Sequence, residues 1–283
     1  MYIFETPDSF EYEKLNSSDI DFREIYDWLA SLRKAGYDPS RVETFYDGKL
    51  TDIEKKYLNS DLDFIINKQV QIIRDGDKNY TIKYTQLLGN KRPKMLFCMG
   101  DITLLNQPSV FVCGARNASK MGLELAYKCG RLIAEEGFVV VSGYARGVDM
   151  EAHLGALEAG GSTVAILPYG LSRFSVRRVL MDAFEPGRFL AASELPPTCS
   201  FKVHAAFRRN KLLAALADAV IVVEPGESGG TWYSAKKAYS LQKPLFYFEG
   251  SRPEIIHEIE SLGGKRLTMK NGAPQLQRVY KKM

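Results

Sequence analysis

A short apolar run, a loop with two glycines and a segment with helical spacing follow one another over residues 138–161, FVVVSGYARGVDMEAHLGALEAGG. The FVVV run is rich in β-branched side chains, which is typical of a buried parallel strand. From Asp149 the apolar residues recur at helical spacing, and Gly160 and Gly161 end the pattern. The stretch therefore predicts a strand, a loop and a helix, which is the repeating unit of an α/β fold.

The same alternation continues on both sides of this unit. Strand-like runs lie at residues 110–113, 163–167, 189–192, 220–223 and 245–248, and helical patterns lie at 119–136, 149–159, 176–184, 208–217 and 232–241. Strands that alternate with helices predict an open, mostly parallel α/β sheet with helices on both faces. Ligands of such sheets bind beyond the carboxyl ends of the strands, where the glycine-bearing loops of this chain fall.

The chain divides into three parts by composition. Residues 1–75 predict a small, mainly helical N-terminal domain, with one amphipathic helix closed at Gly36 and a capping box at Thr51 and Glu54. Residues 76–264 predict the sheet domain, which begins with short strands at 80–84 and 95–99. Residues 265–283 form a basic extension without an acidic residue, expected to bind nucleic acid or to fold along the sheet.

Composition bounds the class of protein. A net charge of +4 favours an anionic partner only slightly. No apolar run approaches the roughly 20 residues of a membrane span, and the N-terminus lacks the apolar region of a signal peptide. The four cysteines show no metal-binding or paired spacing. We therefore expect a cytoplasmic protein with reduced thiols and no metal.

Four loops offer glycines, cations or helix starts that suit phosphate. Their candidate residues are Gly114, Arg116 and Ser119; Ser142, Gly143, Arg146 and Gly147; Arg208, Arg209, Asn210 and Lys211; and Ser228, Gly229 and Thr231. The cation cluster of the third loop is expected at a helix start. Positive charge is unfavourable there because it opposes the helix dipole, and anion binding would explain why the cluster is present. Ordinary glycine turns and a solvated basic face fit the same residues. The GxGxxG pattern is absent, so no dinucleotide cofactor is expected.

No group of residues predicts catalysis. Asp149 and His153 are four residues apart on one helix and can touch, but no third residue completes a metal site. The favoured interpretation is that Asp149 holds the helix start and its loop. A nucleophile elbow is also absent, so a binding protein is predicted and not an enzyme.

Several motifs, in their order and spacing, resemble the DprA/Smf family of DNA-processing proteins. They are VCGARNAS, VVSGYARGVDMEAH, SELPP, RRNKLLAALADAVIVVE and SGGTWYSAKKA, within residues 80–264. The resemblance implies an extended Rossmann-like fold, single-stranded DNA binding, a homodimer and loading of a RecA-type recombinase. It also implies that the phosphate pocket is formed by Gly114, Arg116, Ser119, Ser142, Gly143, Arg146, Gly147, Arg209, Asn210 and Lys211.

The chain departs from the family pattern at several places. Ala206 and Phe207 replace a Phe-Pro pair, Lys211 replaces an arginine, and Tyr144 stands where a small aliphatic residue is common. Tyr144 and Phe207 could stack on bases, and a core position is an equal alternative for Phe207. The N-terminal 75 residues do not match the family's helical module, and the usual C-terminal winged-helix-like module is replaced by about 20 residues.

Two other functions fit the same fold. Residues 228–231, SGGT, echo the loop of nucleotide phosphoribohydrolases, although Tyr233 and Ser234 occupy the positions around that family's glutamate. A nucleotide sensor in phage defence is the third possibility. For the DNA-binding hypothesis we expect single strands to bind better than duplex, and a homodimer through the last strands and helices of the sheet domain. We also expect Arg209→Ala to weaken binding to every sequence alike and Arg209→Glu to abolish most of it, while the protein stays folded.

Overall fold

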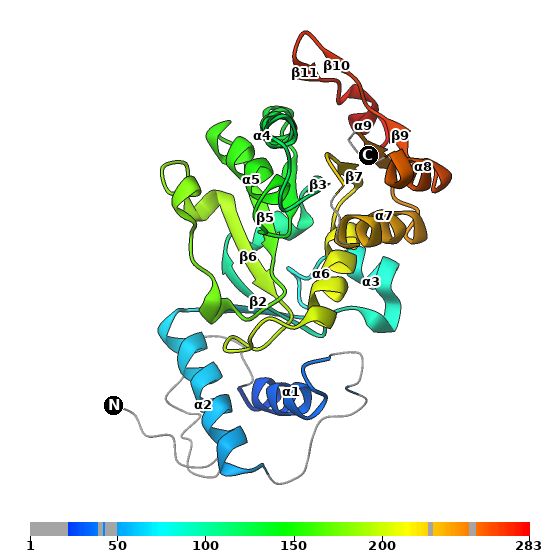
Figure 1. Cartoon of the computed structure of the whole chain (residues 1–283). Helices are drawn as coiled ribbons and strands as arrows, with labels where there is room; N and C mark the ends of the chain where they lie inside the picture. Colours follow the sequence, from blue (N-terminus) through cyan, green and yellow to red (C-terminus); the bar gives the residue numbers. More distant parts are fainter. Residues whose placement is uncertain (1–21, 39–41, 43–49, 226–228, 249–252) are drawn as a thin grey trace.

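The computed structural model describes residues 22–38, 42, 50–225, 229–248 and 253–283. Its sheet has nine strands, in the order β1-β2-β6-β5-β4-β3-β7-β8-β9 (Figure 1). The strands are β1 (Gln71–Arg74), β2 (Met95–Gly100), β3 (Ser109–Cys113), β4 (Val139–Ser142), β5 (Thr163–Ile166), β6 (Phe189–Ser193), β7 (Ala219–Val222), β8 (Leu245–Tyr247) and β9 (Lys265–Arg266). The seven strands from β6 to β9 are parallel, and β1 and β2 extend the sheet antiparallel. The predicted mostly parallel α/β sheet is therefore confirmed.

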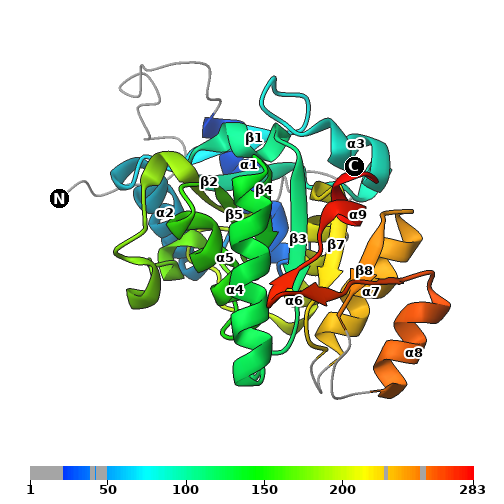
Figure 2. The same cartoon turned by 90° about the horizontal axis from the view of Figure 1, so that it is seen from above.

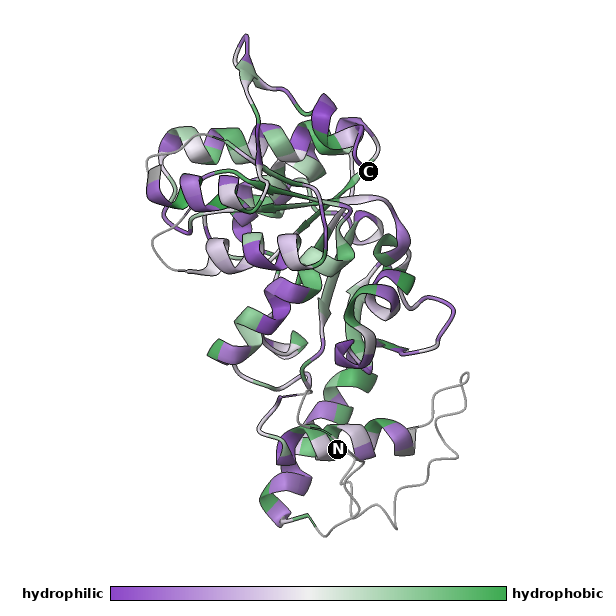
Figure 3. Cartoon of the chain, turned by 90° about the vertical axis from the view of Figure 1, so that its right-hand side faces the viewer, coloured by the Kyte–Doolittle hydropathy of each residue, from purple (hydrophilic) through white to green (hydrophobic). Residues whose placement is uncertain are grey.

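Helices cover both faces of this sheet. They are α1 (Phe22–Lys34), α2 (Asp52–Asn67), α3 (Ile82–Leu88), α4 (Lys120–Glu135), α5 (Val148–Glu158), α6 (Val203–Leu216), α7 (Gly230–Ser240), α8 (Pro253–Ser261) and α9 (Gln277–Tyr280). Side chains alternate along β4: Val139 and Val141 pack with α3, α6 and α7, whereas Val140 packs with α4 and α5. The hydrophobic strands lie between these layers (Figure 3). Both faces are covered, which explains the near-continuous apolar strand sequences.

The N-terminal helices α1 and α2 pack on one face of the sheet, beside the segment that follows β5. Trp28, Leu29 and Leu62 share one buried cluster with Phe97 of β2 and Phe189 of β6. Strand β1, which lies before the predicted boundary at residue 75, pairs with β2. In Figure 2, α2 lies at the side of the molecule opposite α7 and α8.

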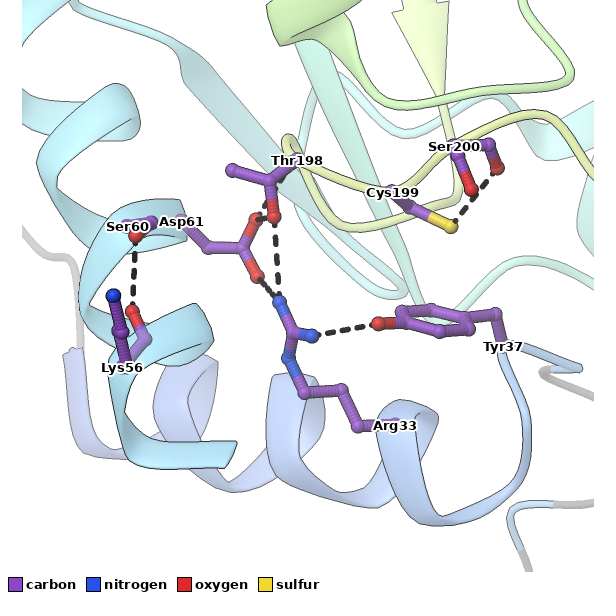
Figure 4. A network of polar contacts seen from close by, with 8 residues as sticks. All are labelled: Arg33, Tyr37, Lys56, Ser60, Asp61, Thr198, Cys199 and Ser200. Atoms are coloured by element: carbon purple, nitrogen blue, oxygen red, sulfur yellow. Dashed lines mark hydrogen bonds and ion pairs between the residues drawn. The ribbon is translucent and has the colours of Figure 1, made fainter. Parts of the chain in front are cut away.

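A polar network fastens the N-terminal helices to the loop after β6 (Figure 4). Asp61 of α2 accepts hydrogen bonds from the backbone N–H and the hydroxyl of Thr198, each at 2.7 Å. Arg33 of α1 pairs with the same carboxylate and donates to the Tyr37 hydroxyl at 2.6 Å. Burial raises the pKa of Asp61, and Arg33 opposes this shift. The network therefore joins α1, α2 and the loop at a water-excluded contact.

Local signals placed several element boundaries correctly. The capping box is present, since Thr51 and Glu54 each bond the other's backbone at the start of α2. Gly36, after α1, has a φ of +66°, which suits glycine. The predicted C-terminal folding along the sheet is also observed, because β9 pairs with β8, and Leu267 and Val279 are buried.

Two predicted elements and one predicted helix start were wrong. Residues 80–84 do not form a strand, because helix α3 begins at Ile82, with buried Tyr84 in its first turn and buried Tyr80 before its N-cap. Residues 176–184 contain only a 3₁₀ turn at Arg178–Leu180, with Leu180 buried and Met181 exposed. Helix α6 begins at Val203, so its cations lie in the second and third turns. The argument from an unfavourable helix dipole does not apply to them.

Candidate functional site

A small pocket opens at the carboxyl ends of the central strands, where the fold class predicts a ligand. Its volume is about 80 Å³. Its walls come from the end of β3, the β4–α5 loop, α6 and the start of α7. Predicted site residues in these walls are Gly114, Arg116, Arg209, Asn210 and Thr231, and Cys113, Ala145, Asp149 and Ser234 join them. The loops that sequence reasoning selected therefore do converge.

Glycine is required where the first two loops meet. A Cβ on Gly114 would lie 2.6 Å from Cγ2 of Val148 and 2.8 Å from the Glu224 carbonyl oxygen. Gly147 has a φ of +85° and precedes α5. The Val148 N–H donates to the Ala115 carbonyl at 3.2 Å, which links the two loops. The glycines thus serve close loop packing as well as access to the pocket.

Asp149 organises the β4–α5 loop. Its Oδ2 accepts from the N–H groups of Gly143 and Ala145, at 3.1 and 3.3 Å. Burial raises the pKa of this carboxyl, and the nearby Arg209 opposes the shift. The interpretation that Asp149 holds its helix start and loop is therefore confirmed. Between the two amides, Tyr144 has a φ of +58° and a side chain that is 3% exposed, so it is a core residue and offers no stacking face.

His153 does not join Asp149. Its Nδ1 lies 2.6 Å from the Thr163 hydroxyl, which itself donates to the Val140 carbonyl oxygen. Nδ1 therefore carries the proton, and the imidazole sits among Tyr144 and Phe189. Burial lowers the pKa of His153 to about 3, and the Arg209 charge adds to the shift. In the described parts of the chain no group of three or more His, Cys, Asp or Glu residues could hold a metal ion.

Arg209 lies inside the pocket wall and is 6% exposed. Its Nη1 donates to the carbonyl oxygens of Gly143 and Ile166, which ties α6 to the ends of β4 and β5. Its Nε is buried without a hydrogen-bond partner among the described residues. Burial lowers the pKa of this guanidinium, and the Asp149 carboxylate opposes the shift. Arg209 therefore supports the fold and presents a fixed positive charge to the pocket.

The adjacent residues of α6 point to different partners. Arg208 donates from Nε to both carboxylate oxygens of buried Glu194, at 2.7 and 2.8 Å, so it is held in an ion pair outside the pocket. Asn210 donates to the Gly230 carbonyl at 3.2 Å and fixes the start of α7. Lys211 is half-buried. Its pKa is lowered by burial first and then by Lys91, Arg208 and Lys237.

The remaining candidates divide into exposed and engaged groups. Arg116 and Arg146 are exposed, and Arg146 donates to the Asn117 side chain. The buried Ser142 hydroxyl donates to the Val112 carbonyl at 2.7 Å, which leaves it a structural role. Gly229 is exposed before α7, whereas Ser228 lies outside the described residues. Arg116 therefore lines the pocket as an exposed cation, Arg146 lies exposed in the adjoining loop, and the buried groups build the pocket wall.

Two features could not be found from the sequence. Glu224, after β7, accepts hydrogen bonds from the backbone N–H and the hydroxyl of Ser119, at 2.9 and 2.7 Å. Ser119 also caps α4, with its Oγ accepting from Gly122 N at 3.0 Å. Lys91 and Lys237 lie near enough to Lys211 to depress its pKa. Only the sheet order brings these residues together, since no local pattern marks them.

The fold and the site define a class: an α/β protein with a Rossmann-like sheet, whose pocket is lined by Arg116 and Arg209 and whose lining carboxylate, Asp149, is tied to the backbone. The family model for DNA recombination-mediator protein A matches residues 71–282. The chain therefore belongs to the DNA recombination-mediator protein A family, the DprA/Smf family, as the motifs predicted.

Curated relatives agree with this assignment. DNA processing protein DprA of Streptococcus pneumoniae is 32% identical over 161 residues, which are 56% of this chain and 56% of that protein. DprA of Bacillus subtilis is 30% identical over 162 residues, which are 56% of this chain and 54% of that protein. The chain thus spans about half the length of the curated relatives it matches.

Solved structures of the family share the fold. DprA of Streptococcus pneumoniae matches with a TM-score of 0.66 and 23% identity, over 90% of this chain and 96% of that one. DNA processing protein A of Helicobacter pylori, solved for its single-stranded DNA binding mode, matches with a TM-score of 0.58 and 28% identity. That match covers 70% of this chain and 90% of the other.

Proposed function

We propose that the pocket and its rim bind the phosphates of single-stranded DNA, and that the protein acts as a DNA recombination mediator by binding and without bond chemistry. The observation that carries this is the pair of arginines that line the pocket at the strand ends, exposed Arg116 and the fixed charge of Arg209, with exposed Arg146 in the adjoining β4–α5 loop. Arginine forks and backbone amides suit phosphate oxygens. The Helicobacter pylori relative, which binds single-stranded DNA, supports the same ligand.

Aromatic rings on α6 and α7 suit the bases of a single strand. Phe207 is 42% exposed, and its ring centroid lies 5.0 Å from that of Tyr233 in an edge-to-face pair. Exposed aromatic rings next to a basic groove stack on unpaired bases and are tolerant of sequence. We therefore expect oligo-dT to bind better than a duplex of equal length.

Fluorescence anisotropy with labelled oligo-dT tests the proposal. Arg146→Ala removes a cation at the rim, and its effect should be a weaker affinity for every sequence and a log–log salt slope reduced by about 0.7 for each lost phosphate contact. Arg131→Ala, on the outer surface of α4, is the matched control and should bind as the parent does. Equal affinity of single strand and duplex would overturn the proposal. So would release of free base from nucleoside monophosphates, which belongs to the phosphoribohydrolase alternative.

We further propose that the protein is a cytoplasmic homodimer that cooperates with a RecA-type recombinase, as the family resemblance implies. Strand β8 is paired with β7 on one side and β9 on the other, so its edge is not open to a second copy. A dimer through the end of the sheet domain would therefore use α8 or the free edge of β9. A monomeric mass by light scattering at micromolar concentration would contradict the dimer. Among the described residues, no helix is long and apolar enough to cross a bilayer.

A further inference from the structure

A second pocket lies at the amino ends of β8 and β9, away from the strand ends that form the first one. Its volume is about 290 Å³. The end of α7 contributes Tyr239 and Gln242, the start of β8 contributes Pro244 and Leu245, and Leu262 closes the wall after α8. An apolar floor with a few polar groups at its edge is typical of a small-ligand site.

Three lysines give this pocket its charge. Lys243, Lys265 and Lys282 line it, and no aspartate or glutamate does. None of the three forms an ion pair within the part of the chain that the structure describes. The neighbouring carboxylate, Asp218, pairs with Lys83 at 2.7 Å. Asp218 also acts on Lys243, so the positive charge left for an anion comes mainly from Lys265 and Lys282.

Helix α7 connects the two pockets. Gly230 and Ser234 at its start line the first pocket, and Tyr239 near its end lines the second. The helix has 11 residues, so at 1.5 Å per residue it is about 16 Å long. In Figure 1, α7 lies on the outside of the sheet beside α6 and α8.

Two pairs of a lysine and an aromatic ring lie along α7 between these pockets. The Lys236 ammonium lies 4.6 Å from the Trp232 ring centre, and that of Lys237 lies 4.8 Å from the Tyr233 ring centre. Tyr239, one turn further, is 58% exposed. A basic track with interleaved rings is the pattern that binds the backbone and the bases of a single strand.

We propose that a single DNA strand continues from the first pocket along α7, and that the lysine pocket holds the phosphate of a further nucleotide whose base packs on Tyr239. This rests on the proposed function of the first pocket. The two pockets lie at opposite ends of α7, so one strand must span several nucleotides to reach both. The path therefore needs an oligonucleotide longer than the first pocket alone can fill.

Binding of oligo-dT of two lengths tests the path. A length of about three nucleotides reaches only the first pocket, and one of about twelve reaches both, since single-strand sites of comparable proteins span roughly 4–16 nucleotides. Lys265→Ala combined with Lys282→Ala should weaken binding of the long oligomer and lower its salt slope by about 1.4, for two lost contacts. Binding of the short oligomer should not change. Both lysines are exposed, and a thermal melt confirms that the variant is folded.

The control removes the same charge elsewhere. Lys68→Ala combined with Lys270→Ala changes two exposed lysines that line neither pocket, and it should bind both oligomers as the parent does. If the pocket variant and the control bind the long oligomer equally, the path along α7 is wrong. If neither oligomer binds the parent protein, the proposed function itself fails. If dTMP binding is lost in the pocket variant and kept in Arg146→Ala, the pocket holds a free nucleotide and the strand path is overturned.

Discussion

The carboxylate of Glu224 occupies the N-terminus of α4 by accepting from both the backbone N–H and the hydroxyl of Ser119. The two residues are 105 positions apart in the chain. An anion is stabilised at this place by the helix dipole and by the amides that the helix leaves unpaired. The sequence predicted that phosphate binds at the start of α4. The carboxylate of Glu224 occupies this position instead, so the exposed arginines are the groups that can bind a ligand.

Glu224→Gln should lower the free energy of unfolding by about 0.3–1 kcal/mol, because a charge leaves the helix N-terminus. It should also tighten single-stranded DNA binding by about two- to five-fold, since one negative charge near the pocket is removed. Urea denaturation and anisotropy measure the two effects. Glu136→Gln, at the other end of α4, is the control and should not destabilise the protein. Weaker DNA binding in Glu224→Gln would contradict this role.

Arg209→Ala should cost about 3 kcal/mol or more of unfolding free energy, because it leaves two strand-end carbonyls and the buried Asp149 without their cation. The sequence alone led us to expect that the protein stays folded when Arg209 is substituted. The buried contacts of Arg209 predict a loss of stability instead. Arg146→Ala, at an exposed site, should change stability by less than about 0.5 kcal/mol. Urea denaturation compares the two. An Arg209→Ala protein as stable as Arg146→Ala would show that the buried contacts are not needed.

His153 should make the protein less stable as the pH falls below neutrality. The pKa of His153 in the folded protein is about 3, below its usual value of 6.5. Between these pH values His153 is protonated in the unfolded chain and neutral in the folded protein. Stability is full above pH 6.5 and falls by about 1.4 kcal/mol per pH unit on the way down. Urea denaturation of His153→Gln from pH 7 to pH 4.5 should show a shallower fall than the parent. Parallel curves for the two proteins would rule out this contribution.

Asp61→Ala should destabilise the protein by about 3–5 kcal/mol, because Arg33 would remain buried without its partner. Thr198→Ala removes only a hydroxyl from the same network and should cost about 1 kcal/mol. The double change Arg33→Met with Asp61→Leu should recover most of the loss, since apolar residues of similar size replace both charges. Thermal and urea denaturation measure all three. A double variant less stable than Asp61→Ala would mean that the ion pair itself is required.

The strands and several helix boundaries could be predicted because their signals are local. The FVVV run of β4, the capping box of Thr51 and Glu54, and the glycine after α1 act through neighbouring backbone groups. The order of strands and loops then fixed where the candidate site lies, since parallel strands bring their carboxyl ends to one edge. Local spacing failed for Tyr80 and Tyr84, because a five-residue alternation fits a strand and a helix equally.

The roles of the individual site residues were decided only by the tertiary structure. Arg208 and Arg209 are adjacent in sequence, yet one pairs with Glu194 and the other reaches Gly143. About 100° separates neighbouring side chains around a helix, so each meets a different layer of the fold. The partner that each side chain contacts is set by segments many residues away in the sequence. The sequence by itself thus determined the sheet, its loops and the family, whereas packing decided which cations are buried supports and which are free to bind.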